Sequence, residues 1–233
     1  MKKHFLLYLF VCLTVWSCGD TATPVKEATN KTAATVEKTT TSQTTAATTN
    51  KKKKVVFFGD SLTAGYGLDA DQGFPSLIQK KIDTLGLEYE VVNAGLSGET
   101  TAGGNSRIDW ILRQPIDVFI LELGGNDGLR GIDPSASFKN LQSIIDKVKA
   151  KYPAAKIVLA GMEAPPNMGN DFTSEFRAMY PKLAKANDTA LIPFLLDKVG
   201  GIPELNQADG IHPTAKGHQL IAETIWKVLK DVL

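Results

Sequence analysis

Residues 55–62 read VVFFGDSL and decide the fold of this 233-residue chain. Four apolar residues that end at a glycine are typical of a strand buried on both of its faces. An aspartate and a serine follow at once, in the place where parallel sheets carry their ligand-binding residues. The stretch therefore predicts a buried strand at residues 55–58 with a polar motif at its carboxyl end.

Strands and helices alternate along the rest of residues 55–233. We expect further strands at residues 89–92, 118–123, 157–160 and 190–194. We expect helices at residues 74–85, 101–112, 135–151, 173–187 and 214–233, the fourth of them interrupted near Pro181. The helices follow from apolar residues that recur every three or four positions. This alternation predicts an α/β fold with a parallel sheet covered on both faces.

The front of the chain differs from the rest in charge. The net charge of +1 divides into +2 over residues 1–17, +4 over residues 18–54 and −5 over residues 55–233. This balance excludes a strongly basic nucleic-acid-binding protein and a highly charged disordered chain. Lys2 and Lys3 precede an apolar run at residues 5–15 that is too short for a permanent transmembrane helix. Residues 1–17 are therefore predicted to be a signal peptide.

Cys18 follows the predicted signal peptide, and Val15-Trp16-Ser17-Cys18 resembles a bacterial lipobox. In such a motif the cysteine is acylated and becomes the mature N-terminus, which gives stable anchoring to a membrane. Ordinary signal cleavage is the alternative. Residues 18–54 are rich in Thr, Ala and Lys and predict a disordered tether. We expect an exported protein of the periplasm or outer envelope. Lys51–Lys54 either contact anionic lipid headgroups or only keep the domain boundary solvated.

Four polar motifs follow predicted strands or precede the last helix. They are Gly59-Asp60-Ser61-Leu62, residues 93–101, Gly124-Gly125-Asn126-Asp127 and Asp209-Gly210-Ile211-His212-Pro213. Ligands of such folds bind beyond the carboxyl ends of the strands, so we expect these motifs to converge there.

The motifs contain the groups that nucleophilic acyl transfer requires. A serine hydroxyl such as that of Ser61 needs a base to take its proton. His4 lies in the signal peptide, and His218 is expected to face solvent from the last helix. His212 lies in a loop and is the candidate base, and Asp209 three residues earlier can accept the imidazole N–H.

An acyl-transfer intermediate also needs donors aimed at its oxyanion. The candidates are the backbone N–H groups of Ser61 and Gly98 and the side-chain amide of Asn126. Residues 55–233 contain no cysteine, which excludes a thiolate metal site there. No metal or nucleotide motif is visible, so we expect no metal and no cofactor.

The four motifs resemble the sequence blocks of the GDSL/SGNH hydrolase superfamily. More narrowly, residues 59–66, 97–104, 124–131 and 180–184 resemble its bacterial periplasmic thioesterase I/lysophospholipase/arylesterase group. The similarity covers essentially all of residues 55–233. It implies a three-layer α/β/α, flavodoxin-like fold whose five-stranded parallel sheet has the order 2-1-3-4-5. It also implies that Ser61 is the nucleophile, His212 the base and Asp209 its orienter, and that Ser61, Gly98 and Asn126 form the oxyanion hole.

The resemblance also implies how substrate binds. In that group the stretch matching residues 128–133 is a mobile loop beside the acyl groove, and the stretch matching residues 165–169 lines the other side. This makes Leu129, Arg130, Pro165 and Asn167 candidate substrate-binding residues. We expect a monomer that hydrolyses acyl esters, thioesters or lysophospholipids and binds no nucleic acid. The alternatives are a carbohydrate or peptidoglycan O-deacetylase of the same superfamily and a non-catalytic envelope binding lipoprotein.

Overall fold

The computed structural model describes residues 51–233. The predicted signal peptide, Cys18 and the predicted tether up to residue 50 lie outside the described residues. Five strands form one parallel sheet in the order β2-β1-β3-β4-β5. They are β1 (Lys53–Gly59), β2 (Tyr89–Gly95), β3 (Val118–Glu122), β4 (Lys156–Ala160) and β5 (Ala190–Ile192). The predicted α/β fold and its strand order are thus confirmed.

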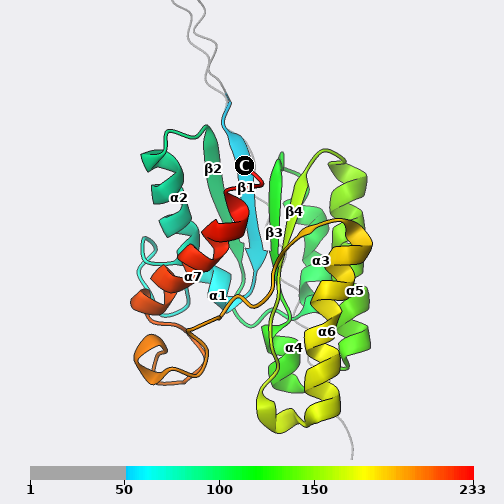
Figure 1. Cartoon of the computed structure of the whole chain (residues 1–233). Coiled ribbons are helices and arrows are strands. Elements are labelled where there is room, and N and C mark those ends of the chain that lie inside the picture. Colours follow the sequence, from blue (N-terminus) through cyan, green and yellow to red (C-terminus); the bar gives the residue numbers. More distant parts are fainter. Residues whose placement is uncertain (1–50) are drawn as a thin grey trace, which may run out of the picture. The chain divides into compact units, whose positions relative to one another are not determined.

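Helices cover both faces of the sheet, with α2 and α7 on one side and α3, α5 and α6 on the other (Figure 1). The helices are α1 (Ser61–Ala64), α2 (Phe74–Thr84), α3 (Thr101–Ile111), α4 (Gly125–Arg130), α5 (Pro134–Lys151), α6 (Asn170–Asn187) and α7 (Ala215–Leu229). Two 3-10 turns, η1 (Pro166–Met168) and η2 (Pro203–Leu205), lie in the loops. Within residues 51–233, none of the helices is long and apolar enough to cross a membrane.

The core is built on the strands at the centre of the sheet. Residues 55–58 of β1 are fully buried, and the ring of Phe58 packs 5.6 Å from that of Phe119 in β3. Burying one large apolar side chain stabilises a fold by about 1.5–3 kcal/mol. The apolar stretch that opens the domain therefore fixes β1 in the middle of the sheet, with the polar motif at its end.

Strand β1 begins two residues before the predicted domain start at residue 55. The ammonium of Lys54 pairs with Glu90 at 2.5 Å, and that of Lys53 lies 5.4 Å from the ring centroid of Tyr89. Both lysines are therefore part of the folded domain, where each has a partner on β2.

Helix α7 ends at Leu229, four residues before the predicted end at residue 233, and two other helices depart further from the sequence prediction. Helix α6 runs without interruption through Pro181, although proline removes one backbone hydrogen bond from a helix. Its buried face holds it in place, because most helical stability in proteins comes from tertiary packing; that face includes Phe176, Met179, Tyr180 and Leu183. Residues 125–130 form α4, so the first half of the loop expected at residues 128–133 is helical.

The prediction that His218 faces solvent is wrong. The side chain is 1% exposed, and its Nδ1 accepts a hydrogen bond from the backbone N–H of Phe74 at 3.1 Å. Phe74 is the first residue of α2, so its N–H has no partner within the helix. His218 of α7 supplies an acceptor for this N–H, so its ring nitrogen stabilises the start of a helix 144 residues away in sequence.

Candidate active site

Ser61 begins a short helix directly after the central strand β1. Asp60 caps that helix, because its Oδ1 accepts the backbone N–H of Leu62 at 3.0 Å. Gly65 ends the helix with a φ of 74°, in the left-handed region that glycine adopts without strain. The Ser61 side chain is thereby fixed at the carboxyl edge of the sheet, where the residue remains 8% exposed.

The structure brings Ser61, His212 and Asp209 into one chain of hydrogen bonds. The Nε2 of His212 lies 2.9 Å from the Oγ of Ser61, and its Nδ1 lies 2.7 Å from Oδ2 of Asp209. The hydrogen bond with the His212 side chain, and then those from the backbone N–H groups of His212 and Ile211, lower the pKa of Asp209 to about 2. An ionised Asp209 holds the proton on Nδ1, which leaves Nε2 free to accept the serine proton.

Two residues that the sequence analysis missed support the imidazole. The ring of Tyr66 lies 4.5 Å from that of His212. The side chain of Gln207 donates to the carbonyls of Tyr66 at 2.8 Å and Pro213 at 3.0 Å, while its backbone N–H donates to the carbonyl of His212 at 2.7 Å. Gln207 therefore joins the loop after α1 to the loop that carries His212. No spacing rule marks a lone glutamine, so this role could not be predicted from the sequence.

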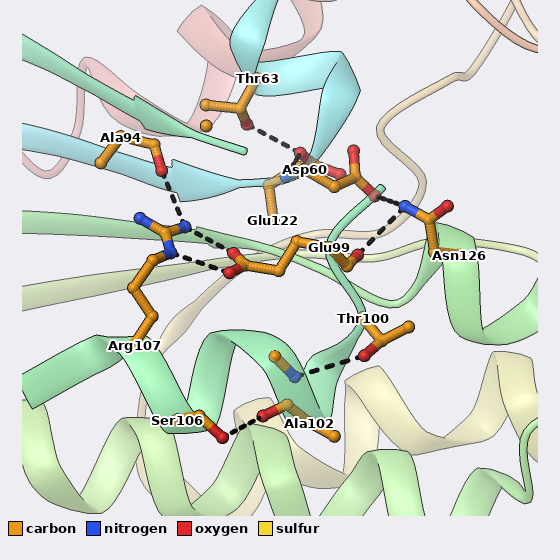
Figure 2. Close-up of polar contacts among 12 residues, drawn as sticks. Asp60, Thr63, Ala94, Glu99, Thr100, Ala102, Ser106, Arg107, Glu122 and Asn126 are labelled. Atoms are coloured by element: carbon orange, nitrogen blue, oxygen red, sulfur yellow. Dashed lines mark hydrogen bonds and ion pairs between the residues drawn. The ribbon is translucent and has the colours of Figure 1, made fainter. Parts of the chain in front are cut away.

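The three predicted oxyanion donors line one cavity together. Gly98 has a φ of 80° at the third position of a turn that the backbone N–H of Glu99 closes on the carbonyl of Leu96 at 3.1 Å. The side-chain amide of Asn126 donates to Oδ2 of Asp60 at 3.1 Å and to the carbonyl of Glu99 at 3.0 Å (Figure 2). An arriving oxyanion would have to share one of these two N–H groups.

Two buried carboxyl groups lie next to the turn that carries Ser61. Asp60 is 1% exposed, and burial raises its pKa to about 6. Glu122 at the end of β3 is also buried, and desolvation raises its pKa well above the ordinary value. Its Oε2 accepts the hydroxyl of Thr63 at 2.7 Å and the backbone N–H of Asp60 at 3.2 Å (Figure 2). Glu122 thus supports the turn that presents Ser61.

Asp127, the last residue of the third motif, has a structural role in this geometry. It is 1% exposed and accepts the backbone N–H of Thr101 at 2.9 Å. It also accepts the hydroxyls of Thr101 at 2.6 Å and Ser137 at 2.9 Å. Asp127 therefore ties α4 to the first turns of α3 and α5.

A cavity of about 740 Å³ opens over Ser61 and His212. Most of its other walls are apolar, and they include Leu62, Leu129, Met162, Ala164, Pro165, Pro166, Phe194, Leu196 and Ile211. A cavity of this size and composition is typical of sites for small apolar ligands.

The four predicted substrate-binding residues differ in their placement. Leu129 and Pro165 line the cavity. Arg130 is exposed outside it and donates to the carbonyl of Gly98 at 3.2 Å. Asn167 is exposed on η1 and is not part of the cavity wall. Each segment thus contributes one residue to the cavity wall, and the helical turn of α4 directs its neighbouring side chains to different sides.

Comparison with known proteins gives concordant matches. Residues 57–220 match the GDSL-like Lipase/Acylhydrolase family. The chain is 42% identical over 176 residues to Esterase TesA of Pseudomonas aeruginosa, covering 75% of this chain and 87% of that protein. It is 39% identical over 176 residues to Thioesterase 1/protease 1/lysophospholipase L1 of Escherichia coli K12, covering 75% and 82%. A solved structure of TesA shares 41% identity and a TM-score of 0.74, covering 78% of this chain and all of that one.

Proposed function

The chain belongs to the GDSL-like lipase/acylhydrolase family and is a serine esterase or thioesterase, and we propose that Ser61, His212 and Asp209 carry its catalysis. The observation that supports this assignment is the continuous chain of short contacts from Asp209 through the imidazole to the Ser61 hydroxyl. It ends at a largely apolar cavity, where an acyl group can lie beside the nucleophile. A nucleophile, a base and an orienting carboxylate in this order are the parts of a serine hydrolase.

The proposed reaction has two steps. The Oγ of Ser61 attacks the carbonyl carbon while Nε2 of His212 takes the hydroxyl proton. Collapse of the tetrahedral intermediate breaks the bond to the alcohol or thiol, which leaves with the proton from His212 and gives an acyl-serine. Water then attacks this ester, with the same imidazole accepting and returning a proton. The carboxylic acid departs and Ser61 regains its hydroxyl.

The negative charge of the intermediate falls on the former carbonyl oxygen. We assign its stabilisation to the backbone N–H groups of Ser61 and Gly98 and to the amide of Asn126, which line the same cavity. Donors held in place before the reaction need no reorganisation when the charge appears. Removing one such donor costs roughly 10²–10³ in kcat.

The substrate class that we propose is acyl esters, acyl thioesters and lysophospholipids. The largely apolar walls of the cavity can bury an acyl chain beside Ser61. The names of the two curated relatives, an esterase and a thioesterase 1/protease 1/lysophospholipase L1, support the same class.

We also propose that the protein is an exported, monomeric lipoprotein held at the envelope by Cys18. The support is sequence alone: the short apolar run, the lipobox-like stretch and the Thr-rich segment that follows. Cys18→Ala should move the protein from the membrane fraction to the soluble fraction and abolish incorporation of labelled palmitate. Unchanged labelling would contradict the anchor.

The catalytic assignment is tested by p-nitrophenyl ester hydrolysis with the full chain. Ser61→Ala should remove nearly all activity above the background left by binding and the oxyanion donors. It should also abolish labelling by a fluorophosphonate probe. Ser76→Ala is a matched control, because the hydroxyl of Ser76 donates to the carbonyl of Ala70 away from the cavity. Equal rates for Ser61→Ala and wild type would refute the assignment.

A further inference from the structure

One arginine holds both ends of the loop that carries Gly98. The loop leaves β2 at its carboxyl end and enters α3 after Thr100. Nη2 of Arg107, on α3, donates to the carbonyl of Ala94 at 3.0 Å, before the loop. The same guanidinium donates through Nε to Oε1 of Glu99 at 2.8 Å and through Nη2 to Oε2 at 2.5 Å, after Gly98 (Figure 2). The path of the intervening backbone is thus set from both sides.

The Glu99–Arg107 ion pair is largely buried and is held in place by an aromatic ring. The Glu99 side chain is 3% exposed and that of Arg107 is 21% exposed. The guanidinium lies over the ring of Phe58, 4.3 Å from its centroid, which fixes its plane against the central strand. A planar guanidinium that contacts both oxygens of a carboxylate sets the orientation of the pair as well as its distance.

Glu99 connects this pair to two of the three proposed oxyanion donors. It directly follows Gly98, whose backbone N–H is one donor. Its own carbonyl accepts the side-chain amide of Asn126 at 3.0 Å, which orients the second donor. We propose that Glu99 and Arg107 are positioning residues that hold the Gly98 N–H and the Asn126 amide where the oxyanion forms. This inference rests on the proposed function of the site.

Charge balance supports the same conclusion. Left unpaired, the buried carboxylate of Glu99 would oppose the build-up of negative charge on the reacting oxygen, because electrostatic interactions are strong in a poorly solvated site. Arg107 neutralises that carboxylate at contact distance. Removing the arginine would therefore both release the loop and leave an opposing charge behind the oxyanion donors.

The first test compares Glu99→Gln, Arg107→Lys and Arg107→Ala in ester hydrolysis. Rates are normalised to sites titrated with a fluorophosphonate and measured well below the melting temperature of each variant. We expect Arg107→Ala to lower kcat by roughly 10- to 100-fold, with KM within about twofold of wild type. Glu99→Gln should lower kcat by less, because it loosens the two-point contact but also removes the opposing carboxylate. Arg107→Lys keeps the charge and loses the two-point contact, so it should recover part of the loss. Unchanged kcat in Arg107→Ala would overturn the proposal.

A matched control is Lys81→Ala. Lys81 also combines an ion pair, 2.7 Å to Glu223, with a ring contact, 5.4 Å to the centroid of Trp226. It joins α2 to α7, and neither partner lines the cavity. Its loss should lower the melting temperature and leave kcat at the wild-type value. A kcat loss as large as that of Arg107→Ala would indicate a general effect of destabilisation and overturn the proposal.

A double-mutant cycle with Asn126→Ala separates positioning from simple structural support. If the pair acts through the oxyanion donors, Glu99→Gln should have a much smaller effect on kcat when Asn126 is already absent. Effects that multiply independently would overturn the positioning role while leaving the Ser61 assignment intact. Full activity in Ser61→Ala would instead refute the proposed function, so the two failures are distinguishable.

Discussion

His218 makes the stability of the domain depend on pH. Its Nδ1 accepts the backbone N–H of Phe74 at 3.1 Å, and its ring stacks on that of Phe74 at 5.5 Å. A ring nitrogen that accepts a hydrogen bond carries no proton, so the folded state holds a neutral imidazole. Burial of the side chain lowers the pKa of His218 from 6.5 to about 4.

The sign of the effect follows from the two states. In the unfolded chain His218 has an ordinary pKa, so this state binds a proton as the pH falls below 6.5 while the folded state does not. The contribution of His218 to the free energy of unfolding is therefore highest near neutral pH, and it decreases as the pH falls from 6.5 towards 4. With the two pKa values above, the free energy of unfolding decreases by about 2 kcal/mol at pH 5 and about 3 kcal/mol at pH 4.

Urea denaturation at pH 7 and pH 5 tests this for wild type and His218→Asn. The asparagine oxygen can replace the Nδ1 acceptor but cannot titrate, so the variant should lose about 2 kcal/mol less than wild type on acidification. Burial raises the pKa values of Asp60 and Glu122, so acidification increases the free energy of unfolding through these two groups. This increase is the same in wild type and His218→Asn and does not affect the difference between them. Gln219→Asn, an exposed change on the same helix, should match wild type. Equal losses in wild type and His218→Asn would refute the reasoning.

Three further outcomes are expected. Asp209→Asn should lower kcat for p-nitrophenyl esters by roughly 10³–10⁴, because the imidazole loses the partner that fixes its tautomer; a change below tenfold would contradict that role. Gly95→Ala should destabilise the domain by about 1–3 kcal/mol or more, seen as a lower melting temperature, because its Cβ would lie 2.2 Å from the backbone nitrogen of Ala64. Leu129→Ala should raise KM for long acyl esters while leaving acetyl esters nearly unchanged, since Leu129 lines the cavity; equal effects on both would separate it from the acyl site.

The fold could be predicted because its signals are local. The four apolar residues before Gly59 form a fully buried strand, as expected. Helix α2 begins and ends within one residue of the prediction, because Gly73 and Pro75 mark its start and Gly86 follows its end. The polar motifs meet because parallel strands present their carboxyl ends at one edge. Ser61, His212 and Asp209 therefore came together in the predicted place.

The errors occur where tertiary contacts override local preference. A stretch with Gly125 and Gly128 has poor helix propensity, yet it forms α4 because Asp127 ties it to α3 and α5. Pro181 is tolerated because the buried face of α6 holds the helix around it. The role of His218 depends on a contact with α2, and the apolar periodicity of α7 does not predict that contact.

The same distinction applies within the site. Ser61 and His212 can be recognised because acyl transfer requires those side chains, whereas the groups that aim the oxyanion donors have no chemical signature of their own. Glu99 and Arg107 look like an ordinary pair eight residues apart, and Asp60 looks like a helix cap. In the fold, the amide of Asn126 is held between Asp60 and the carbonyl of Glu99. Because both N–H groups of the Asn126 amide are already bonded, one of these bonds must weaken when the oxyanion forms. This cost is smaller than the cost of reorienting an amide that was free to rotate, so the fixed amide is still the better donor.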